Sequence, residues 1–196
     1  MSQVRVAVVG AGAMGREHIR AFNAVPDVRV AGISSRTRSR AEALALELNV
    51  DVVAANVAEL KERTGAELVV VAVPELEANA VAKLCFEHDW AVLLEKPAGY
   101  DLADAEDIAA AAAGRERPVM VGLNRRFFAS TLAARADLDQ SDERRFIHVQ
   151  DQQSYEEARR YKHAEKIVER FMYANSIHVV DYLLNFGRGE VLRYQP

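Results

Sequence analysis

A glycine-rich turn near the start of the chain limits the possible folds more than any other feature. Residues 10–15 (GAGAMG) have the spacing G-x-G-x-x-G and follow directly after the β-branched run at residues 4–9. A short apolar run of this kind predicts a strand that is buried on both faces. Residues 13–24 then have helical spacing. A strand, a glycine turn and a helix in this order predict the first unit of a dinucleotide-binding fold.

The alternation of strands and helices continues to about residue 122. Short apolar runs predict five further strands, at residues 28–34, 51–55, 67–73, 90–94 and 118–122. Helical patterns lie at residues 38–48, 76–88 and 101–114, the last with Asp101 as its N-cap and Gly114 as its stop. Such alternation with short connections predicts a parallel sheet covered by helices. The fold class is therefore α/β, with a doubly wound Rossmann domain at residues 1–123.

Residues 124–196 have a different pattern and are assigned to a second domain. We expect a helix at 124–138, a strand at 145–150, a long or broken helix at 156–186 and the start of a strand at 191–194. An apolar stripe runs along one face of the long helix, and Ala174, His178 and Asp181 share the opposite face. These elements do not enclose a core. We therefore expect an incomplete α+β domain, which is a fragment, a truncated reading frame, or a chain that completes its sheet with a partner.

Charge and composition argue against several classes of protein. The formal net charge of −4 gives no reason to expect nucleic-acid binding, and no stretch approaches the roughly 20 apolar residues that span a bilayer. The N-terminus lacks a signal-peptide pattern, so the expected location is the cytoplasm. The single cysteine, Cys85, is expected to be a buried thiol. No histidine has metal-ligand spacing, and no metal site is expected.

The three glycines of the turn have separate expected roles. Gly10 permits the tight turn, Gly12 lets the backbone approach a pyrophosphate, and Gly15 lets the helix pack closely on the strand. Backbone N–H groups at the start of the helix would face the anion. The alternative is a glycine turn that serves packing alone. The expected cofactor contacts of this segment are Gly10, Ala11, Gly12, Ala13, Met14 and Gly15.

The end of the second expected strand indicates which dinucleotide binds. An NAD site usually has an acidic residue there that binds the ribose 2′-hydroxyl. Ser35 occupies that place, and no carboxylate follows until Glu42. Ser35 and Thr37 can donate hydrogen bonds to a 2′-phosphate, and Arg36 can pair with its charge. The pattern favours NADP(H) over NAD(H), with a solvated basic loop as the alternative.

Three further segments occur at characteristic places behind the glycine turn. They are VAVP at residues 71–74, EKP at 95–97 and NRRF at 124–127. In this order and spacing the chain resembles the Gfo/Idh/MocA oxidoreductases, a family similar to glucose–fructose oxidoreductase and inositol dehydrogenase. The resemblance covers residues 1 to about 130 well and the remainder more loosely. It implies a nicotinamide-dependent hydride transfer at a carbon atom of a sugar or cyclitol.

The resemblance also implies roles for residues at the ends of two strands. Lys96 would lie beside the nicotinamide and the substrate hydroxyl, where its ammonium group can stabilise developing charge and take part in a proton relay. Glu95 would orient that lysine or touch the cofactor, and Val73 and Pro74 would line the nicotinamide. Pro97 would follow a cis peptide bond. The alternative for Lys96 is a surface lysine at a strand end.

In the second domain the resemblance is less complete. The family pattern D-x-G-x-H-x-x-D matches residues 174–181 (ANSIHVVD) at His178 and Asp181, but Ala174 and Ser176 replace the first aspartate and the glycine. His178 would act as an acid or base, although the missing carboxylate puts that role in doubt. The alternative is a histidine paired locally. The expected substrate contacts are Lys96, Arg126, His178 and Asp181, although Arg126 could equally brace the domain junction.

The sequence therefore predicts an NADP-dependent oxidoreductase that acts on a sugar- or cyclitol-like alcohol or ketone, a small-molecule substrate. A non-catalytic dinucleotide-binding relative is the first alternative, because Ala174 lacks a carboxylate and the second domain is incomplete. Another Rossmann class, such as an amino-acid dehydrogenase, is the second, and the EKP and NRRF segments argue against it. A homo-oligomer formed through the sheet of the second domain is also expected.

Overall fold

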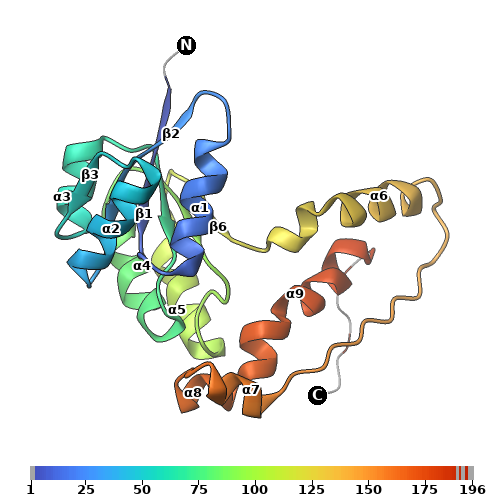
Figure 1. The fold of residues 1–196 in the computed structure, drawn as a ribbon. Coiled ribbons are helices and arrows are strands. Elements are labelled where there is room, and N and C mark those ends of the chain that lie inside the picture. Colours follow the sequence, from blue (N-terminus) through green and yellow to red (C-terminus); the bar gives the residue numbers. More distant parts are fainter. Residues whose placement is uncertain (1–2, 189, 191–192, 194–196) are drawn as a thin grey trace. The chain divides into compact units, whose positions relative to one another are not determined.

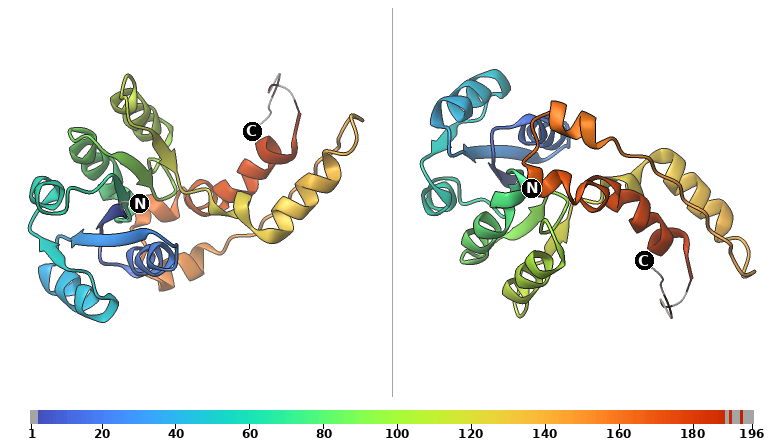
Figure 2. Two further views of the ribbon diagram at one scale, coloured as in Figure 1. Left: turned by 90° about the horizontal axis from the view of Figure 1, so that it is seen from above. Right: turned by 90° about the horizontal axis from the view of Figure 1, so that it is seen from below.

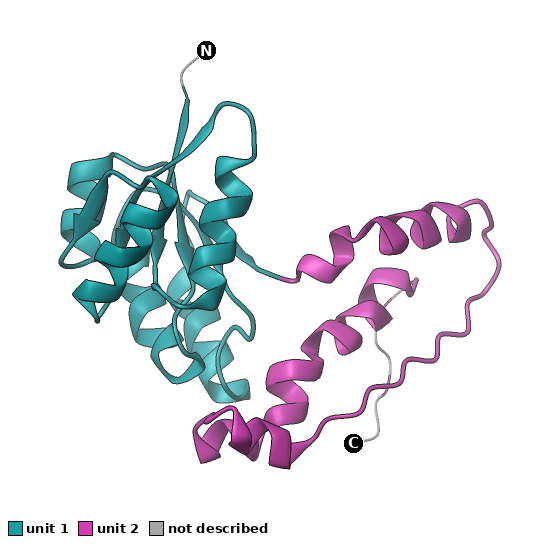
Figure 3. Cartoon of the chain, viewed as in Figure 1, with its two compact units in different colours: residues 1–122 teal, residues 123–196 magenta. Residues whose placement is uncertain are grey.

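The computed structural model describes residues 3–188, 190 and 193 and divides into two compact units. Unit 1 comprises Met1–Gly122 and unit 2 comprises Leu123–Pro196 (Figure 3). No helix in the described part of the chain is both long and apolar enough to cross a membrane.

Unit 1 is built on a six-stranded parallel sheet (Figure 1). Its strands are β1 (Val4–Val9), β2 (Val28–Ser34), β3 (Val52–Ala54), β4 (Leu68–Val71), β5 (Ala91–Leu94) and β6 (Val119–Val121). Their order across the sheet is β3-β2-β1-β4-β5-β6, and every neighbouring pair is parallel. This order reverses between β1 and β4, as in the doubly wound dinucleotide-binding fold. The predicted Rossmann sheet is thus confirmed.

Helices lie on both faces of this sheet (Figure 2). They are α1 (Ala13–Asn23), α2 (Arg38–Leu48), α3 (Val57–Thr64), the 3-10 turn η1 (Glu75–Glu77), α4 (Ala78–Phe86) and α5 (Leu102–Ala112). The side chain of Asp101 accepts a hydrogen bond from the N–H of Asp104, which confirms the predicted cap of α5. Helix α3 was not predicted, although Asn56 caps it in the same way by accepting from the N–H of Glu59.

The alternation of side chains along each strand divides the core of unit 1 into two layers. On β1, Ala7 and Val9 pack into the layer that includes residues of α3, α4 and α5. Val6 and Val8 point the other way and pack with residues of α1 and α2. Both faces of the strand are therefore buried, as the unbroken β-branched run predicts.

Unit 2 is helical in its described residues. Its elements are the 3-10 turn η2 (Asn124–Phe127), α6 (Ala129–Leu138), α7 (Tyr155–Arg160), α8 (Glu165–Val168) and α9 (Phe171–Phe186). The expected long helix is broken into three, with Lys162 at a φ of 60° between the first two. The strand predicted at residues 145–150 is wrong, because no described strand lies beside this segment to pair with it. The strand predicted at 191–194 lies outside the described residues.

Helix α9 does not bury the face that its apolar pattern indicates. Its buried residues are Ala174, Ser176, His178 and Asp181. Met172 and Leu183, from the predicted apolar stripe, are 46% and 42% exposed. On the buried face, Asp181 is paired with Arg126 of η2.

Candidate functional site

The carboxyl ends of five strands meet at one edge of the sheet in unit 1. Four backbone hydrogen bonds of 2.8 to 2.9 Å continue the sheet one residue beyond the strands. They run from the N–H groups of Gly10, Ala72, Glu95 and Gly122 to the carbonyl oxygens of Ser34, Val9, Val71 and Leu94. The loops that follow β1, β2, β4, β5 and β6 therefore start from a rigid edge. In open α/β sheets this edge, at the point where the strand order reverses, holds the ligand.

The three glycines of the turn differ in what surrounds them. Gly10 has a φ of 118°, and a Cβ atom there would lie 2.1 Å from the carbonyl oxygen of Ala72. A Cβ atom on Gly15 would lie 2.0 Å from the carbonyl oxygen of Gly10. By contrast, a Cβ atom on Gly12 would meet nothing within 4 Å. Gly10 and Gly15 are thus required by packing, whereas Gly12 faces open space that a ligand can enter.

The start of α1 is suited to an anion. Gly12 is the N-cap and has no side chain to satisfy the first turn, which also contains no acidic residue. The first hydrogen bond within the helix runs from the N–H of Arg16 to the carbonyl oxygen of Gly12, at 3.1 Å. The N–H groups of the three preceding residues have no acceptor within the helix, and with the helix dipole they favour negative charge. Together with the open space at Gly12, this geometry fits a diphosphate.

The residues expected to discriminate between NADP(H) and NAD(H) follow β2. Ser35 is half-buried, while Arg36 and Thr37 are exposed. Thr37 is the N-cap residue of α2 and makes no side-chain capping bond. The Nη1 atom of Arg36 lies 2.5 Å from the Oε1 atom of Glu77, in the turn η1 that follows β4. The arginine expected to bind a 2′-phosphate therefore already has an acidic partner.

The loop after β5 is tied to α1 through Glu95. The Lys96–Pro97 peptide bond is cis, as the resemblance implies. One carboxylate oxygen of Glu95 lies 2.6 Å from the Nε2 atom of His18, and the other accepts a hydrogen bond of 3.2 Å from the N–H of Lys96. Both side chains of the His18–Glu95 pair are mostly buried. Glu95 thus joins α1 to the backbone of Lys96. Val73 is half-buried and Pro74 exposed where β4 ends.

Two residues near this edge were not identified from the sequence as site residues. The one sequence signal for His18 is its position three residues after Gly15, on the helix that follows the glycine turn. No sequence pattern indicated a role for Glu77, because its contact with Arg36 joins two loops that are 41 residues apart in the chain.

In unit 2, three of the expected substrate contacts, Arg126, His178 and Asp181, belong to one cluster. Ala174, His178 and Asp181 lie on the buried side of α9. Arg126, in η2, donates two hydrogen bonds to the carboxylate of Asp181, and the Nε–Oδ2 distance is 2.7 Å. The hydrogen bond with Asp181 raises the pKa of Arg126. Asp181 is only 5% exposed, so this ion pair is well shielded on one side. Lys96, the fourth expected substrate contact, belongs to unit 1.

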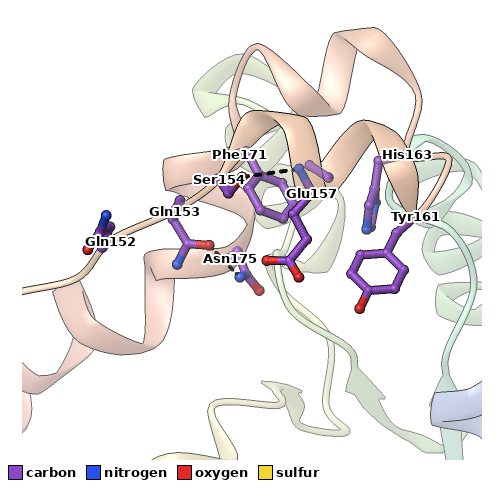
Figure 4. Close-up of a pocket in the computed structure, with 9 residues that line it drawn as sticks. Gln152, Gln153, Ser154, Glu157, Tyr161, His163, Phe171 and Asn175 are labelled. Carbon is purple, nitrogen blue, oxygen red and sulfur yellow. Dashed lines mark hydrogen bonds between the residues drawn. The ribbon is translucent and has the colours of Figure 1, made fainter.

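Unit 2 also contains an open hollow of about 500 Å³ next to α7 (Figure 4). Its lining is polar and aromatic and includes Gln153, Glu157, Tyr161, His163, Phe171 and Asn175. The amide groups of Asn175 and Gln153 are joined by a hydrogen bond of 2.8 Å. His178 and Asp181 are not among its lining residues, so the hollow is distinct from the buried cluster on α9.

Comparison with known proteins agrees with this geometry. Residues 4–123 match the family model described as "Oxidoreductase family, NAD-binding Rossmann fold" (GFO_IDH_MocA). Inositol 2-dehydrogenase 1 from Saccharopolyspora erythraea is 39% identical over 140 residues, which are 69% of this chain and 41% of that protein. Inositol 2-dehydrogenase from Streptomyces avermitilis is 36% identical over 143 residues, covering 71% and 41%.

Among solved structures, the chain is similar to myo-inositol dehydrogenase from Lactobacillus casei, crystallised with NAD(H) and myo-inositol. The TM-score is 0.65 and the identity 26%, over 71% of this chain and 42% of that one. The chain thus spans about two fifths of the length of these relatives.

Proposed function

The chain belongs to the Gfo/Idh/MocA family of oxidoreductases with an NAD-binding Rossmann fold, and we propose that it binds NADP(H) in preference to NAD(H) and acts on a sugar- or cyclitol-like alcohol or ketone. One observation carries the binding proposal: a glycine turn leaves the middle of a sheet in 3-2-1-4-5-6 order, with open space at Gly12. The names of the inositol dehydrogenases support the substrate class.

The preference for NADP(H) is supported by the residues after β2. Ser35, Arg36 and Thr37 place two hydroxyl groups and one guanidinium where NAD sites usually have a carboxylate. A guanidinium and hydroxyl donors suit a phosphate, and a carboxylate would repel it. The relative from Lactobacillus casei was crystallised with NAD(H), and parallel titrations with NADPH and NADH measure the preference of this chain.

We assign the polar groups of the reaction to Lys96 and His178. A bound nicotinamide would supply the hydride chemistry. The ammonium group of Lys96 would donate a hydrogen bond to the reacting oxygen and stabilise negative charge there. His178 would hold or release a proton, and Arg126 and Asp181 would contact the substrate. A homo-oligomer formed by the sheet of the second domain stays a prediction.

A second candidate function is dinucleotide binding without turnover. Ala174 lies on the same buried face of α9 as His178 and has no carboxylate. The carboxylate of Asp181 accepts hydrogen bonds from Arg126. A sensor that responds to the cofactor would need the site in unit 1 alone.

The binding proposal is tested by the substitution Gly12→Ala. Gly12 has a φ of −89° and an open surrounding, so the methyl group leaves the free energy of unfolding within about 0.5 kcal/mol of wild type. The methyl group would obstruct hydrogen bonds from the backbone to the diphosphate, which weakens NADPH binding about tenfold to a hundredfold. Fluorescence titration with NADPH measures the affinity. Unchanged affinity in a folded Gly12→Ala protein would disprove the phosphate site.

The catalytic proposal is tested by turnover with a panel of sugars and cyclitols. NADPH formation by the wild type, lost in Lys96→Ala but with cofactor affinity retained, supports an enzyme in which Lys96 acts. Tight cofactor binding with no turnover of any substrate supports the second candidate function. Full activity of Lys96→Ala would overturn the assignment of the lysine.

A further inference from the structure

The ion pair between Arg36 and Glu77 joins two loops on opposite sides of the phosphate turn. Arg36 follows β2, Glu77 ends the turn η1 after β4, and β1 lies between these two strands in the sheet. The pair therefore crosses the carboxyl end of β1, where residues 10–15 leave the sheet.

We propose that Glu77 determines cofactor selectivity by competing with the 2′-phosphate of NADP(H) for Arg36, an inference that rests on the proposed function. The ribose of the dinucleotide lies at the end of the second strand in this fold. A 2′-phosphate there would need the guanidinium that Glu77 now engages at 2.5 Å. A ribose 2′-hydroxyl is neutral and gains little from a guanidinium, so the engagement of Arg36 by Glu77 affects NADH binding far less.

The exchange of partners is physically accessible. The side chains of Arg36 and Glu77 are 78% and 46% exposed, and an ion pair this exposed contributes little to folding. A rotation of the arginine side chain can therefore move the guanidinium from Glu77 to a phosphate without disturbing the core. The neighbouring cation, Arg38, is engaged by Glu42 at 2.8 Å within α2.

The substitution Glu77→Gln removes the competing charge and keeps the shape of the side chain. We expect the affinity for NADPH to rise about threefold to tenfold, as for two charged groups a few ångströms apart near a protein surface. The affinity for NADH should change less than twofold. The fragments 2′,5′-ADP and ADP should repeat this difference, because only the former carries the 2′-phosphate. The gain should shrink at high salt.

Two control variants isolate the pair. Glu62→Gln removes one acidic charge from the exposed side of α3 and leaves the Arg36–Glu77 and Arg38–Glu42 pairs intact, so the ratio of NADPH to NADH affinity should stay within twofold of wild type. In an Arg36→Gln background, Glu77→Gln should no longer raise the NADPH affinity. Fluorescence of the buried Trp90 checks that each variant is folded.

The outcomes separate this inference from the proposed function. If the wild type binds neither dinucleotide, the proposed function fails and the selectivity proposal fails with it. If the wild type binds, the selectivity proposal alone is wrong when Glu77→Gln changes NADPH and NADH affinities equally, when it weakens NADPH binding, or when its gain persists without Arg36. A selective gain that requires Arg36 supports it.

Discussion

The two units of this chain differ in how completely they bury their large side chains. In unit 1, Ile19, Leu60 and Trp90 are fully buried, and helices cover both faces of the central strands of the sheet. In unit 2, Phe146 is 94% exposed and Leu184 is 63% exposed. Its described helices are joined by polar contacts such as Arg126–Asp181, and its buried large apolar side chains are few, Ile167 and Val168 of α8 among them. Apolar patterning therefore determines packing only where every element finds partners within the described chain.

A large-to-small substitution in the core should give the greatest contrast between the units. Leu60→Ala removes a fully buried side chain of α3 and should lower the free energy of unfolding by about 2–5 kcal/mol. Urea denaturation followed by Trp90 fluorescence measures this, because Trp90 is the only tryptophan and lies in unit 1. The matched control, Leu184→Ala in unit 2, should leave the Trp90 transition unchanged. Equal effects of the two substitutions would contradict the contrast in packing.

Cys85 gives a pH-dependent probe of the same core. Burial raises the pKa of its thiol from 9.0 to about 12. The folded state thus binds a proton that the unfolded chain loses above about pH 9, so this contribution is complete below that pH and is lost as the pH rises toward 12. Relative to Cys85→Ala, wild type should lose about 2 kcal/mol of stability between about pH 9 and pH 11.

The measurement is urea denaturation of both proteins across this pH range. Lysines and tyrosines titrate equally in the two chains, so the difference between them reports the thiol. A difference that does not change with pH would mean that solvent reaches Cys85 in the folded protein.

Removing the Arg126–Asp181 ion pair of unit 2 should cost less stability than the core substitution Leu60→Ala. Arg126→Met leaves the carboxylate of Asp181 buried without its guanidinium, which should destabilise the contact between η2 and α9 by about 1–2 kcal/mol. Far-UV circular dichroism should detect the change, while the Trp90 transition in unit 1 should not move. Adding Asp181→Asn should recover part of the loss, because the buried group is then neutral. A shift of the Trp90 transition would show that the units unfold together.

The same contrast explains which features the sequence predicted. The six strands and the N-cap Asp101 follow from local patterns, and neighbouring elements of the chain satisfy them. The segment at residues 145–150 alternates like a strand, but a strand also needs a neighbour, and none is described there. The buried face of α9 was missed because helical spacing shows which residues share a face but not which face packs, and here the buried face carries Asp181, paired with Arg126 of η2.

The candidate site was predictable to a similar extent. The glycine turn, Ser35 and the EKP segment are contiguous in the sequence, so their types and spacing could be read directly. The contacts of His18 with Glu95 and of Arg36 with Glu77 join segments 77 and 41 residues apart. Each pair depends on which strand ends are adjacent in space, and side-chain partners across two loops leave no periodic pattern in a single sequence.

The smallest effect is expected at the most exposed aromatic residue. Phe146 is 94% exposed in a segment without a strand partner, so Phe146→Ser should change the free energy of unfolding by less than about 0.5 kcal/mol. The preceding residue gives the control. Arg145 donates hydrogen bonds to the carbonyl oxygen of Phe186 and to Asp139, and these hold the extended segment beside the end of α9. Arg145→Met should therefore increase amide hydrogen exchange around residues 145–150, and Phe146→Ser should not. If Phe146→Ser had the larger effect, apolar contacts would hold this segment, and the distinction between an apolar unit 1 and a polar unit 2 would not stand.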